Sequence, residues 1–130
     1  MSEKASLIRY RMDQASESLK EADVLLAAGM SLRSVMNRLY YAMFYAVLAL
    51  LQDKQAGASK HSGAISLFDR EFIKSEIFDK KFSKALHRAF ELRQKGDYME
   101  QTEVTKQDID EIRPAAVEFV ERAESYLKKQ

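Results

Sequence analysis

The stretch Ser31–Gln52, SLRSVMNRLYYAMFYAVLALLQ, is the most apolar part of the chain and decides its fold. Ser31 is a suitable helix N-cap, and the apolar side chains after it are spread around most of a helix instead of along one stripe. A helix that is apolar on nearly all sides is buried on nearly all sides. The sequence therefore predicts a buried second helix at the centre of the fold.

Four further helices are predicted around this one, because apolar residues recur at steps of three and four on both sides of it. Gly29 can close the first helix in the left-handed conformation. Pro114 lies inside the last helix and is expected to kink it or to split off its first two turns. No run alternates with period two, so we expect an all-α fold without a sheet. The predicted boundaries are about residues 2–28, 59 or 60 to 72, 79–96 and 105–128, with exposed loops at 53–59 and 97–104.

The composition predicts one domain over residues 1–130. The chain is 46% hydrophobic and contains one proline and four glycines, which suits long helices. It has no cysteine, which excludes disulfides and thiolate metal sites. The apolar run Leu39–Leu51 is shorter than the roughly 20 residues of a membrane span. We therefore expect a soluble cytoplasmic protein without a membrane segment, and no motif calls for a metal or cofactor.

Charge is nearly balanced over the whole chain but not along it. The formal net charge is +1, which gives no general argument for nucleic acid as a partner. Residues 60–95 contain nine Lys and Arg and five acids, whereas residues 97–130 contain five Lys and Arg and nine acids. Such stretches most often lie side by side as solvated helix faces.

Asn37, Arg38, Tyr41 and Tyr45 are the first group of candidate site residues. Arg38, Tyr41 and Tyr45 step by three and four, so they share one face of the second helix, with Asn37 at its edge. A guanidinium beside phenols suits binding of phosphate and of a stacked base. The alternative is that Arg38 pairs with a buried acid while the tyrosines pack inside the fold.

Lys60 and His61 form the second group, in Lys60-His61-Ser62-Gly63 at the start of a predicted helix. Free amides and the positive helix end favour an anion there, and both side chains add to this preference. His61 can equally be a packed residue beside an ordinary cap. A third group, Arg93, Asp97 and Tyr98, is interpreted as a local Arg–Asp pair, with a supporting role near Arg38 as the alternative.

The run from Asn37 to Ala46, with Lys60–Gly63 and Leu92–Tyr98, resembles the HEPN domain. More narrowly, it is similar to small stand-alone prokaryotic HEPN proteins encoded beside minimal nucleotidyltransferases. The resemblance implies an up-and-down bundle of four or five helices that forms a homodimer. Many HEPN proteins are metal-independent ribonucleases that act as toxins, in defence or in RNA processing. Their motif is an arginine, four to six residues and then a histidine, and two copies meet at the dimer cleft.

This chain departs from that motif, because Arg38 is followed after six residues by Tyr45 and not by a histidine. A tyrosine with a pKa of about 10 is a poor general base at neutral pH. We therefore expect binding of nucleotide or RNA around Arg38, in partnership with a minimal nucleotidyltransferase in a toxin–antitoxin-like system. One alternative is a ribonuclease in which Tyr45 or His61 replaces the missing histidine. The other is a non-catalytic dimerisation or interaction module in which Arg38 is structural.

Overall fold

The computed structural model describes residues 2–57, 60–98 and 103–129. Over these residues the chain forms five α-helices and one short π-helical segment, and no strand. The predicted all-α fold with five helices is therefore confirmed. The elements are α1 (Glu3–Ala27), α2 (Leu32–Asp53), α3 (His61–Phe68), η1 (Asp69–Ile73), α4 (Lys80–Tyr98) and α5 (Lys106–Lys128).

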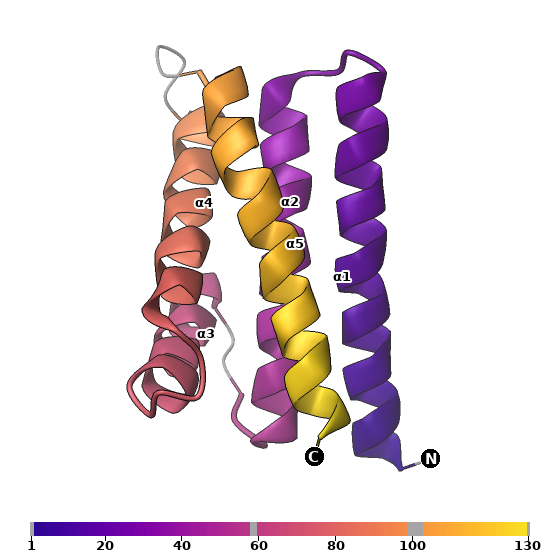
Figure 1. Ribbon diagram of the computed structural model, residues 1–130, viewed down its shortest axis with the longest axis vertical. Helices are drawn as coiled ribbons and strands as arrows, with labels where there is room; N and C mark the ends of the chain where they lie inside the picture. Colours follow the sequence, from indigo (N-terminus) through magenta and orange to yellow (C-terminus); the bar gives the residue numbers. More distant parts are fainter. Residues whose placement is uncertain (1, 58–59, 99–102, 130) are drawn as a thin grey trace.

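The four long helices run alternately up and down the long axis of the molecule (Figure 1). α1 and α2 form a hairpin at one end, and α3 with η1 lies at the opposite end, on the path from α2 to α4. α5 packs across the front of α2 in this view. Because α2 contacts α1, α3, α4 and α5, it holds the central position that its composition predicts.

The core is built mainly on α2, which contributes twelve buried residues to it. Its length and composition are those of a helix that could cross a membrane, but 67% of its apolar window is buried inside the bundle. A second aromatic cluster joins α3 and η1 to α4 and α5, where rings lie at centroid distances of 5.4–5.9 Å. Its members are Phe68, Phe72, Phe78, Phe82 and Phe119.

Several helix ends follow directly from local sequence. The Ser31 side chain caps α2 through the amide of Ser34. Gly29 adopts φ +70°, and Met30 N–H reaches the carbonyl of Leu25, so α1 ends in a Schellman motif. Thr105 and Asp108 form a capping box at the start of the last helix, since each side chain accepts from the backbone N–H of the other.

One boundary between α2 and α4 differs from the prediction and one agrees with it. The third helix was expected to continue to Phe72, but it leaves α-helical geometry at Asp69 and continues as η1. The Asp69 carboxylate is hydrogen-bonded to Ser83 Oγ and His87 Nε2 of α4, both at 2.7 Å. A tertiary contact therefore accompanies the change from α-helical to π-helical geometry. The predicted start of the fourth helix is confirmed, because the Asp79 carboxylate accepts from the amide of Lys81.

Predictions near the C-terminal third need three corrections. α4 continues through Gly96 to Tyr98, because glycine inside a helix costs only about 1 kcal/mol and does not by itself end one. Val104 is buried and not part of an exposed loop; residues 99–102 of that loop lie outside the described part. α5 is continuous through Pro114, so the first two turns are not split off.

Candidate functional site

Tyr41 is the side chain around which the candidate residues gather. The ring of Tyr41 lies 5.2 Å from the Arg38 Cζ and 5.6 Å from the centroid of Tyr45. All three project from one face of α2, as their spacing predicts. Asn37 lies on the neighbouring edge of the same helix. The structure therefore brings together the four α2 residues that the sequence singles out.

Arg38 is half-buried, with 27% of its side chain exposed, and pairs with Glu21 of α1 at 3.3 Å. Its partner is itself 47% exposed, so this is not a buried structural ion pair. Arg38 and Tyr45 also line a groove of about 410 Å³ between α1 and α2. We call it the α1 groove; its other walls are Tyr10, Asp13, Glu17 and Glu21. Arg38 thus makes an ion pair and faces a groove at the same time.

His61 begins α3 and stacks on Phe44 of α2, with ring centroids 4.0 Å apart and planes inclined by 7°. Its Nδ1 is hydrogen-bonded to the hydroxyl of Tyr40 at 2.8 Å. Burial lowers the pKa of His61 below its ordinary value, and the positive charge of Arg93 lowers it further. His61 is therefore neutral at pH 7 and is fixed by two aromatic residues of α2.

Arg93 of α4 supplies the connection between the α2 residues and His61. Its Nε donates to Asn37 Oδ1 at 2.9 Å, and its Nη2 is 3.4 Å from the Tyr41 hydroxyl. The guanidinium also lies within cation–π distance of the rings of Tyr40 and Tyr41, at 5.5 and 5.3 Å. We call this group, formed by Asn37, Tyr40, Tyr41, His61 and Arg93, the Tyr41 cluster.

Lys60 is exposed and occupies the N-cap position of α3, where no side chain caps the helix. Among the described residues no side chain accepts from the first amides of α3, and Lys60 carries a positive charge beside them. His61 is the next residue, so the structure places both members of the second predicted group at one edge of the Tyr41 cluster.

Tyr40 and Phe44 were not among the predicted site residues, and Arg93 was named only for a supporting role near Arg38, as the alternative to a local pair. Phe44 and Tyr40 differ by one helical turn, and this spacing could have indicated a common packing partner. Arg93 was interpreted as the partner of Asp97, whose side chain lies outside the described part; what is seen is its contact with α2. No spacing rule could have joined residues 37 and 93, because the contact depends on how α2 and α4 pack.

The basic stretch of α4 is engaged by acids of α5. Lys81 Nζ lies 2.6 Å from Glu118, and Arg88 lies 3.6 Å from Asp108. These pairs bear out the expectation that the two oppositely charged stretches lie side by side as solvated faces. Among the described residues, Arg38 and Arg93 are the cations that lie over aromatic rings of α2.

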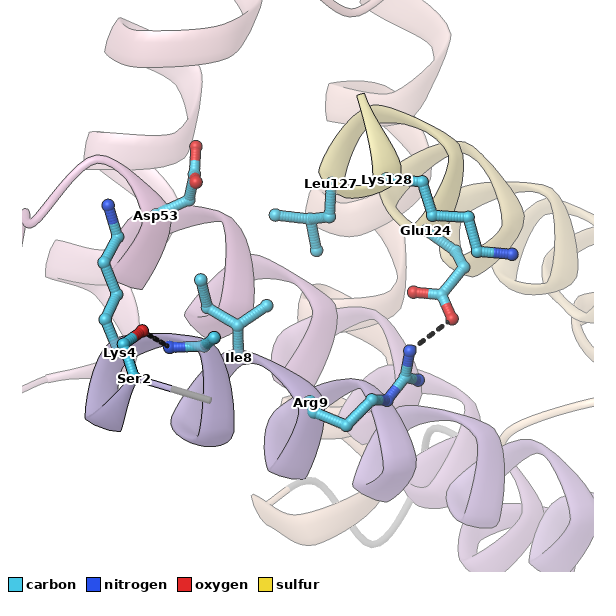
Figure 2. Close-up of a pocket in the computed structure, with 9 residues that line it drawn as sticks. Ser2, Lys4, Ile8, Arg9, Asp53, Glu124, Leu127 and Lys128 are labelled. Atoms are coloured by element: carbon cyan, nitrogen blue, oxygen red, sulfur yellow. Dashed lines mark hydrogen bonds and ion pairs between the residues drawn. The ribbon is translucent and has the colours of Figure 1, made fainter. Parts of the chain in front are cut away.

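Another pocket, of about 380 Å³, lies where α1 begins and α2 and α5 end (Figure 2). Ile8 and Leu127 form its apolar part, and Arg9 bonds Glu124 across it at 2.7 Å. It shares no residue with the Tyr41 cluster or the α1 groove. Within the described residues no three His, Asp or Glu side chains are grouped as metal ligands.

The fold and these contacts define an up-and-down helical bundle with an arginine, tyrosine and histidine cluster on its central helix. The profile of the HEPN domain matches residues 8–126, and the chain belongs to this family. A UPF0332 protein of Thermotoga maritima is 39% identical over 127 residues, which covers 98% of this chain and 90% of that protein.

Two proteins of Methanocaldococcus jannaschii, both named as proposed toxins, are also similar. One is 34% identical over 91 residues, covering 70% of this chain and 62% of that protein. The other is 29% identical over 122 residues, covering 94% of this chain and 90% of that protein. Homologues of this HEPN protein thus include proteins whose names propose a toxin role.

Proposed function

We propose that this HEPN protein is a toxin-like component that binds the phosphate groups of a nucleotide or RNA across the Tyr41 cluster. The observation that carries the proposal is the convergence of cationic and aromatic side chains from α2, α3 and α4. Tyrosine and histidine rings offer stacking faces for bases, and charged side chains contact phosphates. Lys60 and the uncapped start of α3 extend this surface.

Arg38 and Tyr45 form the other border of the proposed surface. Arg38 contributes a positive charge next to Tyr41, but Asp13, Glu17 and Glu21 lie on its far side. Carboxylates repel phosphate, so the ligand lies on the side of Tyr41 that faces His61 and Lys60. Asn37 orients Arg93 through their hydrogen bond.

Binding of a fluorescent single-stranded RNA and of ATP tests the proposal, with Lys60→Ala and Arg38→Ala as the variants. Lys129→Ala is the control, because Lys129 is also exposed and its loss changes the net charge equally. We expect Lys60→Ala and Arg38→Ala to weaken RNA binding by about three- to tenfold and to reduce the salt dependence by roughly one phosphate contact each. Equal affinity of all three variants contradicts the proposal.

A metal-independent ribonuclease is the second candidate function, and the state of His61 favours it. His61 is neutral at pH 7 because its pKa is lowered, so it can accept a proton at that pH. In the same experiment, RNA is incubated with purified protein and with folded His61→Gln and Arg38→Ala. Cleavage that falls by about a hundredfold or more in both variants establishes a nuclease; absent cleavage with intact binding leaves the binding function.

The proposed partners are a second copy of the chain and a minimal nucleotidyltransferase. Their support is the HEPN family membership and the toxin names of two relatives. A nucleotidyltransferase gene beside the coding sequence favours this system. If Arg38→Ala alters only stability, and neither ligand binding nor RNA cleavage, a pure interaction module is the better account.

A further inference from the structure

The α1 groove has a different chemistry from the Tyr41 cluster, although Arg38 borders both. Three of its lining residues are acids and one is a base. Asp13 pairs with Arg9 at 3.0 Å and Glu21 with Arg38 at 3.3 Å, while Glu17 has no ion pair with any described residue. The groove is therefore negative overall, and its field favours a cationic occupant.

The acids are regularly arranged along one helix. Asp13, Glu17 and Glu21 follow each other at steps of four, so their side chains lie in a row with about 5–6 Å between neighbours. A partner helix with basic residues at the same spacing can meet all three. The regular spacing favours a helical segment over a small cation.

Apolar and aromatic groups accompany the acids. Tyr10 is 56% exposed and Leu7, one turn before it on α1, is 43% exposed. Tyr45 forms the opposite wall of the groove on α2. Tyrosine rings attract guanidinium and ammonium groups, and the aliphatic stems of Arg and Lys pack on apolar side chains. The groove thus offers carboxylates for the charged ends of a basic, amphipathic segment and aromatic rings for its apolar stems.

We infer that the α1 groove is the docking site of a basic helical segment of a partner protein, whose Arg or Lys side chains bind Glu17 and pack on Tyr10. A second copy of this chain fits less well. Its most basic helix is α4, which carries the acids Glu118 and Asp108 of α5 beside Lys81 and Arg88, so the carboxylates of the groove would meet further carboxylates there. The segment therefore comes from a different chain.

The probe is an alanine-based helical peptide of about 18 residues, long enough to be helical alone, with arginines four residues apart and leucines beside them. Isothermal titration compares wild type with Glu17→Lys and Glu111→Lys. Glu111 is an exposed acid on α5 without an ion pair among the described residues, so both variants change net charge equally. We expect Glu17→Lys to weaken binding about tenfold and Glu111→Lys by less than about twofold.

Tyr10→Ser removes an exposed ring and is expected to weaken binding of the peptide by about two- to fivefold without affecting the fold. Equal weakening by Glu17→Lys and Glu111→Lys overturns the inference, since only bulk charge then matters. A change in sedimentation of the protein alone on Glu17→Lys also overturns it, because a second copy then fills the groove.

Discussion

The ring of Tyr41 lies within cation–π distance of two guanidinium groups, those of Arg38 and Arg93. At partly exposed positions each such contact contributes about 0.5–1 kcal/mol. The two arginines have different environments: Arg38 is tied to Glu21 of α1, and Arg93 to Asn37 of α2. Tyr41 is therefore the residue through which a change on the α1 side can reach the side that contains His61.

The stability of the protein should depend on the protonation of His61. Burial, and then Arg93, lower the pKa of His61, so the folded state binds this proton less readily than the unfolded state does. The unfolding free energy should therefore rise with pH near the ordinary pKa of about 6.5, and fall as pH drops from about 7 to about 5. Urea denaturation at a series of pH values measures this slope.

His61→Gln is the matching variant, because it removes the titrating group and keeps a polar side chain next to Tyr40. We expect the pH slope of its unfolding free energy over the same range to be smaller than that of wild type. The pair of His87 and Asp69 is present in both proteins, so the comparison isolates His61. Identical slopes would show that His61 protonation is not coupled to folding.

The α2 part of the site was predictable because it depends on spacing within one helix. Arg38, Tyr41 and Tyr45 had to share a face once residues 31–52 were interpreted as helical. The contact of Arg93 with Asn37 was not predictable, because it joins α2 to α4 and depends on their rotation and offset. The acids beside Arg38 come from α1, so they could not be placed from the sequence of α2. They make the groove negative although Arg38 itself is positive.

α5 remains helical although it contains Pro114, which is unfavourable inside a helix. It is continuous from Lys106 to Lys128 although Pro114 removes the backbone donor that would bond the carbonyl of Asp110. Its capping box fixes the start of the helix, and Ile109, Ile112 and Ala116 bury one face on both sides of the proline. Packing of this face therefore maintains the helix across the missing hydrogen bond.

Pro114→Ala should stabilise the protein, because Pro114 is exposed and alanine restores the missing donor. Proline in a helix interior is about 3 kcal/mol less favourable than alanine, but it also restricts the unfolded chain. We expect a net gain of about 1–3 kcal/mol in the unfolding free energy from urea denaturation. A loss of stability would mean that α5 depends on the geometry that the proline imposes.

Element boundaries set by capping residues were predictable, and those set by tertiary contacts were not. Ser31, Asp79, Gly29 and Thr105 act locally, and the structure has each where the sequence placed it. The change to η1 at Asp69 accompanies bonds to Ser83 and His87, which come from another helix.

At the scale of the whole molecule, the aromatic cluster connects the second half of the chain to the core. The ring of Phe119 in α5 lies 5.4 Å from that of Phe68 and 5.9 Å from that of Phe82. All three are buried. One side chain of α5 thus packs against both α3 and α4.

Phe119→Ala should destabilise the domain by about 3–5 kcal/mol, since it removes a fully buried ring and leaves a cavity between three helices. A single domain over residues 1–130 should still unfold in one transition, so far-ultraviolet and aromatic signals should shift together to lower urea. Separate transitions for the two signals would show that the α1–α2 hairpin folds independently of the rest.

The central position of α2 has a consequence for how the protein folds while it is synthesised on the ribosome. α2 packs on α1, which is synthesised before it, but also on α5, which is made last among the described elements. Until residues 106–128 leave the ribosome, a helix with the composition of a membrane span has an uncovered flank. The domain therefore completes its core only when α5 has emerged, and until then the exposed apolar flank of α2 favours aggregation of the nascent chain.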